Sequence, residues 1–209
     1  MPLDPHDLDV HLLEAIRRAV QPSREKPRGL YDVSAALDGL WLRFSACAAH
    51  EDAIAVLVAD EQRLLETRSA QEKELFEFLL TGASALECAA FAVYRYASCL
   101  SQGYRFSSAV ENFKLSKTAR AFKQAYPGAE ITRVIAEIDA SREWALWKRA
   151  RNILLRRAHP WRESSSAGPA QWLGEEFGYE FSANRRKWLA PTLHRILLGT
   201  ESFVTAHPL

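Results

Sequence analysis

The sequence of 209 residues lacks the features that mark a membrane or secreted protein. No uninterrupted apolar run approaches the roughly twenty residues that a helix needs to cross a bilayer. The first fourteen residues, MPLDPHDLDVHLLE, are acidic and have neither the basic start nor the apolar stretch of a signal peptide. These absences predict a cytoplasmic protein that does not work at a membrane.

Patterns that bind metals or cofactors are also missing. The three cysteines, Cys47, Cys88 and Cys99, are far apart and lie among alanines and aromatic residues, which favours reduced thiols in a core over disulfides or metal ligands. The six histidines show no metal-ligand spacing, and there is no glycine-rich phosphate loop or nucleophile motif. The sequence therefore predicts neither a metal nor a cofactor.

No segment alternates polar and apolar residues for long enough to predict a sheet. Helical spacing covers most of the chain instead, and it indicates an all-α bundle of about seven helices in a single domain, residues 1–209. Asp32, Ser69 and Ser141 are the expected N-caps, with Ser69 and Glu72 forming a capping box. The expected helices cover 7–20, 32–65 with a break near 50–52, 70–103, 116–125, 130–139, 141–158 and 185–205.

Two further features organise the chain. The helix at 70–103 is apolar around most of its circumference, so we expect it to be the central and most buried element. Residues 160–184 form a long connection between two helices, beginning PWRESSSAGP and then carrying several aromatic residues. A connection of this length within one domain is often functional or disordered, although a surface loop held by a few aromatic side chains also fits.

Positive charge is concentrated in one place, although the net charge of the chain is only +1. Residues 149–162, RARNILLRRAHPWR, hold five arginines and one histidine. Basic side chains suit the C-terminal end of a helix on structural grounds alone, but they also bind anions. The arginines expected to reach solvent, and so to bind RNA or another phosphate, are Arg149, Arg156, Arg157 and Arg162.

Arg151 differs from these neighbours because helical spacing places it on one stripe with Trp144, Trp147 and Leu154. We therefore expect its guanidinium to be at least partly buried. A buried arginine without a partner costs several kcal/mol. Arg151 should consequently bind a carboxylate, backbone carbonyls or an external anion such as phosphate.

At Arg151-Asn152, followed by apolar residues, further arginines and a histidine, the chain resembles the HEPN domain family. The signature of that family is an arginine, usually followed by a polar residue, with a histidine four to six residues further on. The segments SKTARAFKQAYPG, SREWALWKRARNILLRRAHP and NRRKWLAPTLHRILL resemble the surroundings of the motif in bacterial HEPN-like proteins. The resemblance covers roughly residues 70–205. It implies a helical bundle that forms a homodimer with the two motifs facing each other.

The resemblance implies two kinds of function. Many HEPN proteins are metal-independent endoribonucleases of toxin or defence systems. In such an enzyme Arg151 would stabilise the negative charge of the developing phosphorane, His159 would transfer the proton, and Asn152 would orient the arginine or hold the phosphate. Others are non-catalytic and bind RNA or a protein partner such as an antitoxin.

This chain departs from the signature at the catalytic histidine. Arg156 stands where relatives carry histidine, and His159 follows Arg151 by eight residues. His159 could equally be a structural residue at the end of the helix. The departure favours an RNA-binding or partner-binding protein with weak or no catalysis. An endoribonuclease that uses Arg151 and His159 is the alternative, and a small-ligand sensor with a pocket beneath residues 160–184 is a third hypothesis.

Overall fold

The computed structural model describes residues 8–21, 27–59, 65–101, 106, 113–156, 162–163, 171–172 and 185–209. Its helices are α1 (Val10–Ala19), α2 (Gly29–Ala59), α3 (Leu65–Ser98), α4 (Leu115–Ala125), α5 (Glu130–Ala140), α6 (Arg142–Arg156) and α8 (Ala190–Ala206). A single π-helical turn, η4 (Arg185–Leu189), leads into α8. The predicted all-α fold is confirmed. A two-residue antiparallel ladder of β1 (Arg162–Glu163) and β2 (Gln171–Trp172) adds no layer to it.

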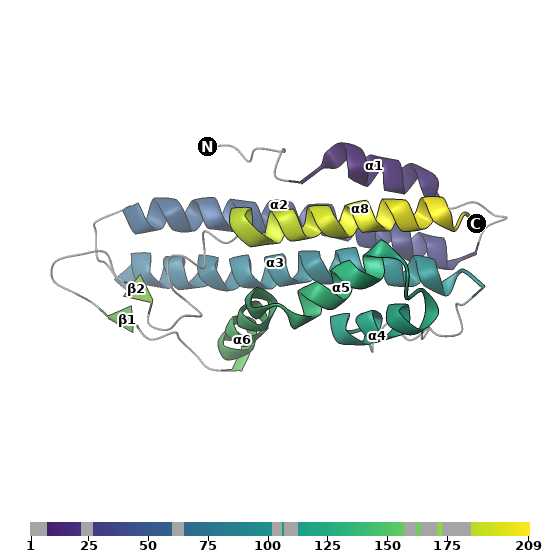
Figure 1. Cartoon of the computed structure of the whole chain (residues 1–209). Coiled ribbons are helices and arrows are strands. Elements are labelled where there is room, and N and C mark those ends of the chain that lie inside the picture. The colour runs from purple at the N-terminus through teal and green to yellow at the C-terminus, as the bar shows by residue number, and fades with distance from the viewer. Residues whose placement is uncertain are drawn as a thin grey trace.

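The long helices α2 and α3 pack along each other as an antiparallel pair, and α4, α6, α8 and η4 also contact α3 (Figure 1). The helix α8 runs beside this pair, and α1 packs mainly against α8. The short helices α4, α5 and α6 lie together on one side of α3, away from α1 (Figure 1). The first and last helices of the chain are therefore neighbours, and α3 is the central element.

The predicted central position of α3 is confirmed, although the helix covers Leu65–Ser98 rather than 70–103. Alanines on several of its faces are buried, so α2, α6 and α8 can approach it closely. Its Ser69–Ser98 segment is long and apolar enough to cross a bilayer, and more than half of its most apolar window is buried inside the fold. A helix buried among other helices can have the same apolar composition as a membrane-spanning helix. The composition of α3 therefore does not distinguish a core helix from a membrane span.

Two of the expected N-caps are wrong, and a third is confirmed. Asp32 lies inside α2, where its carboxylate accepts hydrogen bonds from Arg95 Nε at 3.0 Å and Nη2 at 2.6 Å, so it joins α2 to α3 instead. Ser69 lies within α3, which begins four residues earlier. Ser141 does cap α6, because its Oγ accepts a hydrogen bond from the backbone N–H of Trp144 at 3.2 Å.

The expected break near residues 50–52 is also wrong, since α2 continues without interruption to Ala59. The polar residues there suggested a loop, but His50 Nδ1 lies 2.6 Å from a carboxylate oxygen of Glu74 on α3. One turn later, Ile54 is buried in the core. Both the polar and the apolar residues of this stretch therefore make tertiary contacts, and the helix continues through them.

Candidate functional site

The helix α6 is anchored by its tryptophans, which face the interior. Trp144 and Trp147 are both buried, and the Trp147 ring centroid lies 5.2 Å from that of Phe78 and 5.9 Å from that of Trp188. Its indole passes directly over Gly82 of α3, where an added Cβ would lie 2.2 Å from Cζ3. The tryptophan side chains of α6 therefore pack within their own chain.

Arg151 lies at the edge of the same contact and pairs with Glu87 of α3. Its Nη1 donates to Glu87 Oε1 at 3.0 Å, and the side chains are 22% and 37% exposed respectively. The Nε of Arg151 is buried and has no hydrogen-bond partner among the described residues. The predictions that Arg151 is partly buried and has a specific acceptor are therefore confirmed, and the acceptor is a carboxylate of the protein itself.

Replacing Arg151 by alanine should lower the free energy of unfolding by about 1–2 kcal/mol, between the values for exposed and buried ion pairs. Glu87 would then keep a half-buried charge without this partner. For a chain of this size the melting temperature should fall by about 2–8 °C, which thermal unfolding followed by circular dichroism measures.

The matched control is Glu87→Gln, which removes the same charge pair from the other side and keeps the size of the side chain. The Arg151→Ala/Glu87→Gln double variant should lose less free energy of unfolding than the sum of the losses in the two single variants. Strict additivity would show that the ion pair contributes nothing to stability.

The outward face of α6 carries a polar stripe. Arg142, Arg149 and Asn152 are all exposed and recur at helical spacing, while Ala145 separates the first two. Lys148 flanks the stripe, with its Nζ 5.5 Å from the ring centroid of Trp144. The sequence-predicted residues Arg149 and Asn152 thus share a surface, and Arg151 points away from it toward α3.

The remaining predicted site residues are not tested. Arg156 belongs to the last turn of α6 and Arg162 to β1, but only their backbone is described. Arg157 and His159 lie outside the described residues, as does most of the 160–184 connection. The distance between His159 and Arg151, on which the catalytic hypothesis depends, therefore stays a prediction.

A second basic surface lies on α4, which the sequence reasoning missed. Lys114, Lys117, Arg120 and Lys123 are all exposed, and Leu115, Thr118, Ala121 and Phe122 form the buried face. Residues 113–129 contain no aspartate or glutamate, and none of these four cations has an ion pair with a described residue. The signal was present in the sequence as an acid-free stretch with four positive charges.

The neighbouring helix α5 is different because its arginine is neutralised. Arg133 donates to Glu137 at 2.7 Å and also pairs with Glu130, while Glu137 accepts a further bond from Arg195 of α8. These two arginines hold the pKa of Glu137 below its usual value. Among the described residues, basic side chains without an ion pair are therefore a feature of α4 and not of every exposed helix on this side of α3.

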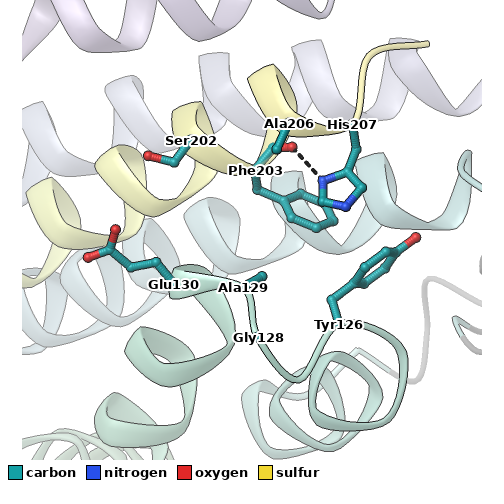
Figure 2. A pocket seen from close by; sticks show the side chains of 8 residues that line it. All are labelled: Tyr126, Gly128, Ala129, Glu130, Ser202, Phe203, Ala206 and His207. Atoms are coloured by element: carbon teal, nitrogen blue, oxygen red, sulfur yellow. Dashed lines mark hydrogen bonds between the residues drawn. The ribbon is translucent and has the colours of Figure 1, made fainter.

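A hollow of about 460 Å³ lies at the turn between α4 and α5, beside the end of α8. Tyr126, Phe203 and His207 form its aromatic wall, with ring centroids 4.5–5.2 Å apart. Figure 2 shows Glu130 and Ser202 toward one end and Tyr126 and His207 toward the other. The imidazole uses Nδ1 in a hydrogen bond to the carbonyl of Phe203 at 3.0 Å. The hollow thus brings together no described acid–base pair or nucleophile–base pair.

Cys88 and Cys99 are not activated as nucleophiles. All three are free thiols. Burial raises the pKa of Cys88 and of Cys99 above the usual thiol value, although nearby Arg43 and Arg95 respectively act in the opposite direction. Neutral thiols are poor nucleophiles and poor metal ligands. Within the described ranges, no three His, Cys, Asp or Glu side chains converge on a point where they could hold a metal ion.

Comparisons of this chain with family models, with curated proteins and with solved structures found no match.

Proposed function

We propose that this protein is a HEPN-like helical protein that binds RNA through the outward basic faces of α6 and α4. The observation that carries the proposal is the four-cation face of α4, which is exposed, contains no acidic residue and has no ion pair with a described side chain. It lies on the same side of α3 as α6, whose outward stripe adds Arg142, Arg149 and Asn152 (Figure 1).

These residue types suit a phosphate backbone better than a base sequence. Lysine and arginine neutralise phosphates and release counterions, and an amide such as that of Asn152 donates to phosphate or sugar oxygens. The aromatic residues of α6 and α4 are buried, so the described faces of these two helices offer no rings on which bases could stack. The expected mode is therefore binding of the backbone with little sequence preference.

Cleavage of RNA is the alternative function. A catalytic role for Arg151 competes with its bond to Glu87, although the buried Nε leaves one donor unused. Incubating the protein with mixed structured RNAs without metal and sequencing the cut ends tests this alternative. Cleavage that His159→Ala abolishes would make the protein an endoribonuclease, whereas intact RNA would leave binding as the function.

The binding itself is tested by salt titration. The Arg142→Ala/Arg149→Ala variant should bind unrelated RNA sequences more weakly, and by the same factor for each. The slope of log K against log salt should become shallower by about 1.5, because each lost phosphate contact reduces the slope by roughly 0.7–0.9. Fluorescence anisotropy of two labelled RNAs of different sequence gives both quantities.

The matched control is Arg17→Ala/Arg18→Ala, which removes the same charge from α1 on another face of the bundle. It should bind RNA nearly as well as the unchanged protein. Equal weakening by both variants would show that only net charge matters. No binding at low salt by the unchanged protein would overturn the RNA proposal and leave a protein partner, such as an antitoxin, as the ligand of these faces.

A further inference from the structure

The outer face of α2 is apolar and uncovered. Its Tyr31, Leu42 and Val56 are 57%, 68% and 71% exposed, and no other large apolar side chain among the described residues is exposed to this extent. Among the described elements α2 packs along α3, with a small contact to α1. Monomeric proteins rarely leave a contiguous apolar patch of this kind in water, and such patches mark interaction surfaces.

The apolar residues on this face follow a regular pattern. Ala35, Leu42, Ala49 and Val56 recur every seven residues, and Gly39, Ala46 and Ala53 lie four residues after the first three of them. Alternating steps of four and three residues make the seam of a coiled coil. We call these seven residues the α2 seam. At 1.5 Å per residue the seam is about 32 Å long, which is enough for six turns of a partner helix.

We propose that the α2 seam binds the α2 seam of a second copy of this chain, with the two helices parallel. The seam is a convex ridge rather than a groove, so a small ligand or an extended peptide has nothing to fill. A second helix with the same spacing fits it, and α2 itself has that spacing. In a parallel pair Leu42 meets Leu42 and Val56 meets Val56, while the small Ala46 and Ala53 allow the backbones to approach closely. Gly39 does not contribute to this approach, because the Arg43 guanidinium covers it, with Nη1 2.7 Å from an added Cβ.

The charges beside the seam favour this orientation. In a parallel pair the residue that precedes a seam position on one helix faces the residue five places later on the other. Asp38 and Arg43 are five residues apart and lie on opposite sides of the seam. Both are exposed, and Arg43 has no ion pair with a described residue, because its guanidinium bonds only the Gly39 carbonyl. Asp38 binds Arg17 through Oδ1, so Oδ2 can accept Arg43 of the second copy.

An antiparallel pair would be less favourable. It would place Asp38 beside Asp52 of the other copy and Arg43 beside His50, so each flank would oppose similar groups. Large residues would then face small ones, with Leu42 opposite Ala49. The parallel and antiparallel pairs therefore bring different residues together across the two-fold axis. Cross-linking of an introduced cysteine distinguishes the two orientations.

Light scattering coupled to gel filtration tests the proposal on the purified full chain. The unchanged protein should have a mass of about 47 kDa, twice that of the 23.6 kDa chain. Leu42→Asp should give a monomer, because it places a charge at the centre of the seam. The matched control is Leu198→Asp, which changes an exposed leucine on α8 and should remain a dimer. Circular dichroism checks that each variant is folded.

A second variant tests the orientation. Ala49→Cys should form a disulfide between copies under mild oxidation, since a seam residue faces its own copy in the parallel pair, and the unchanged protein should not. A monomeric unchanged protein, or a dimer that persists in Leu42→Asp, would overturn the proposal. A dimer without the Ala49→Cys cross-link would overturn the parallel orientation. The proposed dimer does not depend on RNA binding, so the dimer proposal and the RNA-binding proposal can each be wrong without affecting the other.

Discussion

Replacing Gly82 by alanine should destabilise the protein by about 2 kcal/mol, even though alanine favours helices by about 1 kcal/mol over glycine. The reason is the crossing of α3 and α6, where the new methyl group would lie 2.2 Å from Trp147 Cζ3 and 2.4 Å from Cη2. A buried, rigid indole cannot move aside cheaply. Thermal unfolding should show a melting temperature lower by about 4–8 °C.

Two controls isolate the cause. Gly128 has nothing within 4 Å of an added Cβ, so Gly128→Ala should leave stability unchanged or raise it slightly. In a Trp147→Phe background the outer ring atoms over Gly82 are absent, so Gly82→Ala should cost much less than in the unchanged protein. An equal cost in both backgrounds would contradict the steric explanation.

Reversing the charge of α4 should have the largest effect on RNA binding. The Lys117→Glu/Arg120→Glu/Lys123→Glu variant should bind on the order of a hundredfold more weakly at low salt, because like charges then face the phosphates at a cost of several kcal/mol. The three side chains are exposed and the apolar face of α4 is unchanged, so the fold should persist. Fluorescence anisotropy with the same two RNAs measures the loss.

The control for this variant is Ser116→Ala/Gln124→Ala, which changes the two exposed uncharged residues of the same helix. It should bind RNA as the unchanged protein does. If the α4 reversal left binding intact while the α6 variant weakened it, the RNA-binding surface would be α6 alone. If both were without effect on a protein that binds RNA, the interface would lie outside these two helices.

The helices could be predicted because their signals are local. Apolar residues at helical spacing identified α4, α5, α6 and α8 within a few residues, and Ser141 was recognised as a cap because a cap bonds the N–H three residues later. The errors at Asp32 and near residue 50 have the opposite cause. There the partners are Arg95 and Glu74, which are distant in sequence, so no local pattern could show that the helix continues.

The candidate site could be predicted only in part. Helical spacing showed that Arg151 lies on the tryptophan side of α6, but not that Glu87, 64 residues earlier, is its acceptor. The same limit applies to Gly82, whose role depends on the crossing of two helices. The basic face of α4 can be recognised in the sequence as a stretch without acidic residues, but the denser cluster of arginines at 149–162 pointed to α6 alone.

The packing of α1 against α8 has a consequence for the chain during its synthesis. The apolar face of α1, formed by Leu12, Leu13 and Ile16, rests mainly on a helix that is made more than 170 residues later. At a synthesis rate of about 5–20 residues per second, on the order of ten seconds or longer pass between the synthesis of α1 and that of α8. Until then its leucines are exposed, while α2 and α3, which are adjacent in the chain, can already pair. Chains truncated before residue 190 should therefore be bound by chaperones or aggregate.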